Sequence, residues 1–206
     1  SGAVSDRDTF FCPGYRVVDG KRIKCWRSIG HGSQHLAEGV KNSCNCVFMD
    51  LALRMGTGKF YDNLRKFGFG SKTGVDFYSE SSGLMMNEKS VKTVDLARIG
   101  FGQAVAVTPI QLIAGVSAVV NGGMYHTPHF VNTITDQNGK TVYEHSGEER
   151  RVISQATSEK MRGLLENVVK EGSGKKAGVA GYRIGGKTGT AQKYENGAIA
   201  QGKYVS

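Results

Sequence analysis

Apolar residues recur with a helical period in four stretches of the chain. These stretches run from about 43 to 55, from 59 to 67, from 108 to 122 and from 158 to 171. In the third, Thr108 has good N-cap chemistry, Pro109 suits the first helical position, and Gly122-Gly123 favours termination. Its face of recurring apolar residues consists of Ile110, Ile113, Val116 and Val120. The periodicity therefore predicts four helices.

Strand-like runs are shorter and fall elsewhere. Residues 129–135 and 141–145 flank Asp136-Gln137-Asn138-Gly139, a turn sequence that predicts a β-hairpin. Residues 1–34 are predicted to be loop-rich, and residues 69–92, dense in serine and glycine, are predicted to form an extended loop. A Gly-rich hinge at 172–181 precedes a strand region at 182–206. Antiparallel strands with helices segregated around them predict an α+β fold, with residues 1–206 in one domain.

The composition is that of a globular chain. It has 206 residues, 39% of them hydrophobic, which is enough to bury a core. It contains neither an apolar run of about 18 residues, the length of a membrane span, nor a secretion signal. The net charge is +9, but lysine and arginine are scattered without interleaved aromatic residues, so we expect no nucleic-acid partner. This charge also suits an enzyme that works beside anionic polymers and lipid headgroups.

The segment Lys187-Thr188-Gly189-Thr190 carries the most chemistry in the chain. On an edge strand, alternation would place Lys187 and Gly189 on one face and the two threonines on the other. Such an edge offers a positive charge, short hydroxyls and free backbone N–H groups, and Gly189 allows a substrate backbone to approach closely. These features suit an extended peptide that ends in a carboxylate. The structural alternative is a Gly-rich hairpin with a solvated lysine.

A second motif, Ser43-Cys44-Asn45, lies far upstream. A Ser-x-Asn element followed by Lys-Thr-Gly is the order found in enzymes that acylate a serine supplied by a Ser-x-x-Lys element. Ser43 also has a structural alternative, because Asn-Ser-x-Asn before an apolar helix is a common N-cap signal. Both roles are compatible, since a helix terminus is a rigid mount for a catalytic hydroxyl.

Together with the neighbouring sequence, these motifs resemble the transpeptidase domain of class B penicillin-binding proteins, most closely their sporulation-specific and division-specific members. The further strings that carry the resemblance are Phe-Phe-Cys-Pro-Gly at 10–14, Gly-His-Gly at 30–32, Ile-Gly-Phe-Gly-Gln at 99–103 and Thr-Pro-Ile-Gln-Leu at 108–112. The resemblance implies a penicillin-binding/β-lactamase-like fold, an antiparallel sheet flanked by helices, that is incomplete here at both ends.

The sequence departs from the family pattern in two respects. A Ser-x-x-Lys element should precede the strings above and does not occur there; residues 1–5 resemble the tail of the helix that carries it. Beyond Ser206 the family continues into a further strand and a closing helix. We therefore expect a piece of a longer protein, with the acylated serine and a membrane anchor upstream. The second departure is Cys44, which stands where the family has aspartate.

The resemblance implies a peptidoglycan D,D-transpeptidase that cross-links stem peptides, binds β-lactam antibiotics and works on the extracytoplasmic face of the cell membrane. By resemblance, Ser43 relays protons, Asn45 orients the lysine of the missing element, and Lys187 hydrogen-bonds Ser43. The backbone N–H of Thr190 would complete the oxyanion hole. The residues that bind the donor peptide would be Thr188, Gly189 and Thr190.

Several functions remain open at this point. The likeness to sporulation-specific members predicts spore cortex synthesis in the forespore intermembrane space, with a polytopic glycosyltransferase as partner. A vegetative septal transpeptidase is the first alternative. A D,D-carboxypeptidase or β-lactamase-type hydrolase shares the motifs and passes the acyl group to water. Outside the enzymes, the alternative is a non-catalytic scaffold module of the wall-synthesis complex.

The four cysteines all fall in the first quarter of the chain, with two histidines among them. Such clustering favours zinc, with disulfides and buried free thiols as alternatives. Resemblance to zinc-containing family members indicates a structural zinc in a loop-rich region, 1–46, that ends in the Ser-x-Asn motif. Its ligands by this resemblance are Cys12, Cys25, His31 and Cys44. Cys46 would then be a small core residue.

Overall fold

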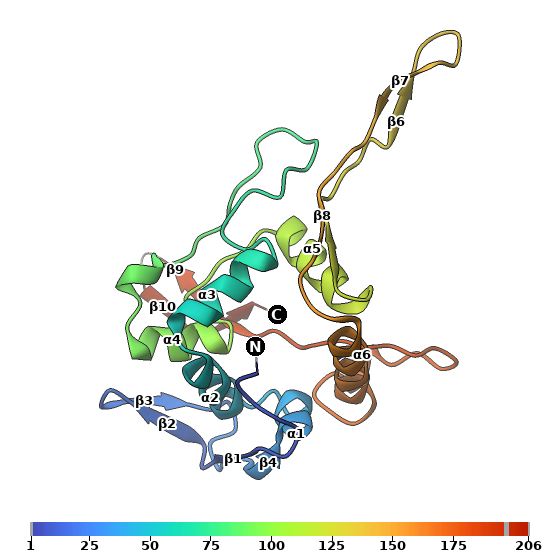
Figure 1. Ribbon diagram of the computed structural model, residues 1–206. Coiled ribbons are helices and arrows are strands. Elements are labelled where there is room, and N and C mark those ends of the chain that lie inside the picture. Colours follow the sequence, from blue (N-terminus) through green and yellow to red (C-terminus); the bar gives the residue numbers. More distant parts are fainter. Residues whose placement is uncertain (1, 196–197, 206) are drawn as a thin grey trace. The chain divides into compact units, whose positions relative to one another are not determined.

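Residues 2–195 and 198–205 are described by the structure, a computed structural model (Figure 1). The chain forms two compact units, the first comprising Ser1–Lys59, Asn87–Ala104 and Arg162–Ser206, and the second Phe60–Met86 and Val105–Met161. Helices and small antiparallel sheets make up the described residues, which confirms the α+β prediction. None of the helices that these residues form has the length and apolar character that a bilayer span requires.

The first unit begins with two antiparallel strand pairs, β1 (Thr9–Cys12) with β4 (Gly32–His35), and β2 (Tyr15–Val18) with β3 (Lys21–Lys24). Asp19 and Gly20 form the turn between β2 and β3, with φ angles of 47° and 72°. Positive φ at both positions matches the twist of a two-residue hairpin. The region predicted to be loop-rich, 1–34, therefore also contains short strands that were not predicted from the sequence. Strands of 4 residues are too short for their alternation to be recognised in sequence.

The helices of the first unit are α1 (Leu36–Lys41), α2 (Asn45–Met55), α4 (Thr93–Gly100) and the short η1 (Glu88–Ser90) and η2 (Lys175–Ala177). Strands β9 (Ala191–Glu195) and β10 (Ala198–Val205) pair antiparallel near its end. Helices α3 (Thr57–Lys66) and α6 (Gln155–Lys170) run across the division between the units. The helices expected at 43–55, 59–67 and 158–171 are thus confirmed, with shifted starts.

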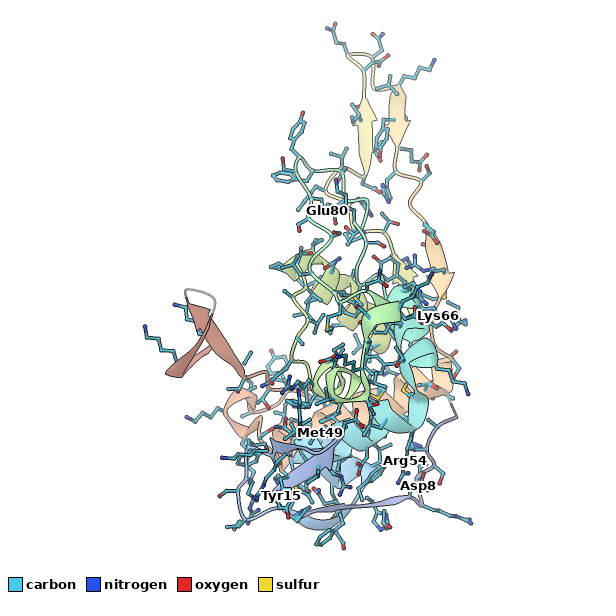
Figure 2. All side chains as sticks on the ribbon, turned by 90° about the vertical axis from the view of Figure 1, so that its left-hand side faces the viewer. Asp8, Tyr15, Met49, Arg54, Lys66 and Glu80 are labelled. Atoms are coloured by element: carbon cyan, nitrogen blue, oxygen red, sulfur yellow. The ribbon has the colours of Figure 1, made fainter. Side chains whose placement is uncertain are left out.

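Helix α2 is the centre of the first unit's core, where it packs against β1, β2 and α4 (Figure 1). Met49, labelled in Figure 2, is fully buried there. At the exposed end of α2, Arg54 Nη1 lies 3.5 Å from Asp8 Oδ2 (Figure 2). The buried residues of this core include Phe10, Val18, Ile23, Val47, Met49, Val94, Ala97 and all four cysteines. The predicted zinc region is therefore part of the main core of this unit.

The crossing of α2 and α4 depends on a glycine. Gly100→Ala is expected to destabilise the domain by about 1–3 kcal/mol, because a Cβ there would lie 2.5 Å from Ala52 Cβ and 2.9 Å from the Phe48 carbonyl oxygen. Gly163 of α6 is the matched control: nothing lies within 4 Å of a Cβ at that position. Alanine at 163 should stabilise the helix by up to about 1 kcal/mol. Chemical denaturation measures both variants, and equal stabilities would contradict the close crossing.

The second unit contains α5 (Pro109–Val120) and two strand pairs, β5 (Met124–His126) with β8 (Glu149–Arg151), and β6 (Thr133–Thr135) with β7 (Thr141–Glu144). The β6–β7 hairpin confirms the turn prediction: Asp136 Oδ1 accepts the N–H groups of residues 138 and 140 at 2.9 Å. The N-cap prediction is also confirmed, because Thr108 Oγ1 accepts the N–H of Gln111 at 3.2 Å. Residues 69–92 are largely irregular, as predicted, except for η1.

The buried face of α5 is not its periodic apolar face. Gln111 and Ala118 are buried, whereas Ile113 and Val116 are 64% and 50% exposed. A Cβ on Gly115 would lie 3.0 Å from a ring carbon of a phenylalanine in the preceding loop. The close approach of that loop therefore leaves no room for a larger side chain at Gly115.

Candidate active site

Ser43 lies in the turn between α1 and α2, and its backbone is unusual. Its φ of 51° falls in the left-handed region that few non-glycine residues adopt. The N–H of Ser43 donates to the Val40 carbonyl at 3.1 Å. Trp26 Nε1 donates to the carbonyl oxygens of both Asn42 and Ser43, each at 3.1 Å. These hydrogen bonds hold a conformation that costs free energy on its own.

The same turn excludes the N-cap alternative for Ser43. Cys44, with extended dihedral angles, is the N-cap of α2, and Asn45 is the first helical residue. The Ser43 hydroxyl is therefore directed to another segment instead of capping the helix that follows it. Asn45 is held by its side chain, because its Nδ2 donates to the Lys24 carbonyl at 3.4 Å.

Lys187 meets Ser43 across 144 residues of sequence: its Nζ donates to Ser43 Oγ at 2.6 Å. An ammonium has no acceptor, so the serine oxygen accepts, and the serine's own proton is left to donate elsewhere. Nζ also donates to the Thr188 carbonyl at 2.9 Å and lies 5.8 Å from the centre of the Phe48 ring. Desolvation in this position lowers the pKa of Lys187. The two sequence motifs therefore form one site.

The segment that leads to Lys187 is fixed to α6. Arg183 donates to both carboxylate oxygens of Glu166, at 3.2 and 2.7 Å, and Lys170 Nζ lies 2.7 Å from Glu166 Oε1. Hydrogen bonds from Arg183 first, and then Lys170, lower the pKa of Glu166 to about 2. One residue before the lysine, the N–H of Gly186 donates to the Leu165 carbonyl at 3.1 Å. These contacts with a helix fix the position of the segment that carries Lys187.

Thr188, Gly189 and Thr190 are exposed and lie directly before β9, so the prediction of a strand that already contains them is wrong. A strand needs a ladder partner, and β9 finds β10 only from Ala191 onward. Nothing lies within 4 Å of a Cβ built on Gly189, so this stretch is open to a ligand. Thr188 Oγ1 lies 3.0 Å from Ser173 Oγ.

The cysteines form a second cluster behind the Ser43 turn. The four thiols of Cys12, Cys25, Cys44 and Cys46 are buried and free, and all their sulfurs lie within 4.8 Å of one another. His31 Nδ1 lies 3.6 Å from Cys12 Sγ and 3.7 Å from Cys25 Sγ, while its buried Nε2 has no partner among the described residues. Three of the four predicted ligands therefore meet in this cluster, His31 lies at its edge, and Cys46 joins it.

Hydrogen bonds among these thiols give them different pKa values. The hydrogen bond to Cys44, and then that to Cys46, lowers the pKa of the Cys25 thiol. The shared hydrogen bond with Cys25 raises the pKa of Cys44 to about 11 and is also the main cause of the raised pKa of Cys46. Within the cluster, Cys25 is therefore the most acidic of these three thiols.

Several residues that support the site have no signature in the sequence. Glu166 and Ser173 lie in and just after an ordinary amphipathic helix, and Arg183 is one cation among many. Their roles depend on partners in other segments, which no local pattern records. Trp26, next to Cys25, could have been suspected only because it is the chain's single tryptophan.

This arrangement can transfer protons and bind an anion. The cation at Lys187 polarises Ser43, whose free proton can pass to a departing amine. The exposed hydroxyls and open backbone at 188–190 can bind a carboxylate beside it.

Known proteins are similar to this chain in sequence. A family model described as "Penicillin binding protein transpeptidase domain" matches residues 1–205. Stage V sporulation protein D of Bacillus subtilis (strain 168) is 45% identical over 97% of this chain. Peptidoglycan D,D-transpeptidase MrdA of Acinetobacter baumannii is 33% identical over 98% of it. The chain spans only 31% and 30% of the lengths of these two relatives.

Solved structures agree with the sequence relatives. Penicillin binding protein 3 of Mycobacterium tuberculosis, complexed with aztreonam, has a TM-score of 0.87 and 30% identity over 99% of this chain and 46% of that one. A D,D-transpeptidase domain from Eggerthella lenta has a TM-score of 0.82 and 25% identity, over 94% of this chain and 50% of that one. The expected penicillin-binding fold is thereby confirmed. With its two motifs joined at Ser43 and Lys187, this chain belongs to the penicillin-binding protein transpeptidase domain family.

Proposed function

We propose that this chain is part of a peptidoglycan D,D-transpeptidase, which cross-links stem peptides through an acyl-enzyme on a serine of the parent protein. The observation that carries the proposal is the 2.6 Å hydrogen bond from Lys187 Nζ to Ser43 Oγ. It joins the two motifs in a geometry suited to proton transfer. The relatives named as transpeptidases have the same role, which supports the assignment.

The proposed reaction has two halves. The parent's serine attacks the donor carbonyl, the amide C–N bond breaks, and Ser43 donates its proton to the departing amine nitrogen. Ser43 recovers a proton from the attacking hydroxyl through the lysine of the Ser-x-x-Lys element. An amine of a second stem peptide then attacks the acyl carbonyl, the ester C–O bond breaks and the cross-linking amide forms. The proton of that amine returns to the serine oxygen through Ser43 and the lysine of the Ser-x-x-Lys element. Lys187 keeps the local potential positive throughout, and Asn45 donates to the substrate amide.

Fluorescent penicillin tests this function on the full-length parent protein. We expect one covalent label, which is lost when the serine of the Ser-x-x-Lys element is replaced. A folded protein that takes up no label would contradict the proposal and favour the scaffold alternative. Slow loss of the label, over many minutes, would distinguish a transpeptidase from a hydrolase, which releases the penicilloyl group rapidly.

Spore cortex synthesis is the proposed biological role. Its support is the 45% identity to stage V sporulation protein D. In this role the parent protein is membrane-anchored, faces the forespore intermembrane space and works with a polytopic glycosyltransferase. A deletion strain that grows normally but forms spores without cortex would support it, whereas a septation defect in growing cells would favour the vegetative alternative.

A structural zinc is the second part of the proposal. The donor set fits the metal: sulfurs that bind one tetrahedral zinc at ~2.3 Å lie about 3.8 Å apart, and the four thiols here are within 4.8 Å of one another. All four cysteines are buried, as the ligands of a closed structural zinc site would be. We propose Cys12, Cys25 and Cys44 as ligands, with Cys46 preferred to His31 as the fourth. The metal would fix the start of α2, and hence Ser43.

The acylation rate is expected to fall with rising pH before the ordinary lysine range is reached. Desolvation lowers the pKa of Lys187, so its ammonium loses the proton at a lower pH than a free lysine, whose pKa is 10.5. The rate of penicillin acylation between pH 7 and that value measures this effect. The Lys187→Arg variant should acylate more slowly than the wild type. Its acylation rate should not fall through this range because of residue 187, since a guanidinium stays charged. An identical decline in both proteins would assign it to another group.

A further inference from the structure

Ser173 is the residue outside the two motifs that contacts the proposed carboxylate site. Its Oγ lies 3.0 Å from Thr188 Oγ1 and 3.5 Å from the Lys41 carbonyl oxygen. Ser173 and Thr188 are 15 residues apart, and both belong to the Arg162–Ser206 part of the first unit. Ser173 lies in the turn after α6 and Thr188 follows Lys187, so the contact depends on how the chain folds back between them.

The turn that carries Ser173 is held rigidly. The N–H groups of Gly172 and Gly174 both donate to the Val168 carbonyl, at 3.1 and 3.0 Å, and the N–H of Ser173 donates to the Lys41 carbonyl at 3.2 Å. A Cβ on Gly172 would lie 2.5 Å from that same Lys41 oxygen. The backbone thus approaches the end of α1 as closely as glycine permits, which fixes the position of the Ser173 side chain.

The hydrogen atoms at Thr188 can be assigned from the donors around it. Ser173 has one hydroxyl proton, and its acceptors are Thr188 Oγ1 at 3.0 Å and the Lys41 carbonyl at 3.5 Å. Either hydroxyl can be the donor over the shorter distance, and donation by Ser173 leaves the Thr188 proton available to a ligand. Lys187 Nζ, which can only donate, also lies 3.5 Å from the same threonine oxygen. With Ser173 and Lys187 as donors to its oxygen, Thr188 can direct its own proton outward.

We propose that Ser173 is a positioning residue that orients the Thr188 hydroxyl as a donor toward the terminal carboxylate of the donor peptide or of a β-lactam. This inference rests on the proposed transpeptidase function. A carboxylate only accepts hydrogen bonds, so a hydroxyl is useful there only when its proton points at the ligand. Ser173 fixes that orientation before the ligand binds, so less conformational entropy is lost on binding.

The expected effect depends on the ligand's charge. Ser173→Ala in the full-length parent protein should slow acylation by benzylpenicillin roughly five- to tenfold, the loss of one oriented hydrogen bond. Acylation by the methyl ester of benzylpenicillin, which lacks the anion, should change by less than about twofold, because an ester needs no such donor. A merely structural role would slow both reactions equally.

A shape-matched pair removes the contribution of packing. Ser173→Thr keeps the hydroxyl and should retain the preference for the acid over the ester, whereas the nearly isosteric Ser173→Val should lose it. Ser90→Ala is the control, because Ser90 Oγ also donates to a carbonyl, that of Asn87 at 2.8 Å, on the surface of the same unit. It should leave both rates unchanged.

The outcomes separate this inference from the function on which it rests. A wild-type parent that no penicillin acylates would overturn both. Normal wild-type acylation, with the acid-to-ester rate ratio unchanged in the alanine and valine variants, would overturn the role of Ser173 alone. A reduced ratio in both variants, restored by threonine, supports it.

Discussion

Replacing Lys187 with alanine is expected to reduce penicillin acylation of the parent protein by about 10²–10³-fold, the range seen when one preorganised electrostatic contact is removed from a transition state. The Lys187 ammonium donates to Ser43 Oγ at 2.6 Å. Without it, the serine oxygen loses its fixed donor, and its proton is no longer directed at the departing amine.

Stopped-flow or gel-based labelling gives the rate, and thermal unfolding gives the stability of the same variant. The melting temperature should change little, because Lys187 lies outside regular structure. Lys175→Ala, in η2 of the same unit, is the matched control and should acylate as the wild type does. A Lys187 variant with a normal rate would refute the proposed proton pathway through Ser43.

Removal of the proposed zinc is expected to have the largest effect on stability. Structural zinc sites contribute about 10–16 kcal/mol of binding free energy in small domains, and this free energy is part of the folding free energy. A strong chelator should therefore lower the melting temperature sharply and slow acylation at the same time, since the cluster is the core beneath the Ser43 turn. Protein purified without added metal should contain close to one equivalent of zinc.

Single substitutions identify the ligands. Cys44→Ser should lose the metal and lower the melting temperature while leaving the Ser43 hydroxyl in place. Comparing Cys46→Ser with His31→Ala decides the fourth ligand: we expect the cysteine variant to lose zinc and the histidine variant to retain it, because only the thiols all lie within 4.8 Å of one another. A zinc content below about a tenth of an equivalent, together with a melting temperature that a chelator does not change, would contradict the proposed zinc site. The four cysteines would then be buried free thiols.

Strong local signals made much of the fold predictable. The cap and Pro at Thr108-Pro109, the turn at Asp136 and the long periodic helices were recognisable because each depends on residues close together in sequence. The two motifs, taken in order with their neighbouring strings, were also enough to identify the family. What the local signals missed was orientation, as on α5, where Gln111 is buried and Ile113 is exposed.

The sequence by itself determined the family, the fold class, the main helices and the residue types of the site. Only the tertiary structure decided which atoms meet. Ser43 turned out not to cap its helix, because its left-handed φ directs the hydroxyl to Lys187, 144 residues away. Cys46 joined the thiol cluster, and Ser173 reached Thr188, through contacts between segments. Such contacts depend on backbone paths and close packing, and neither leaves a period or a spacing in the sequence.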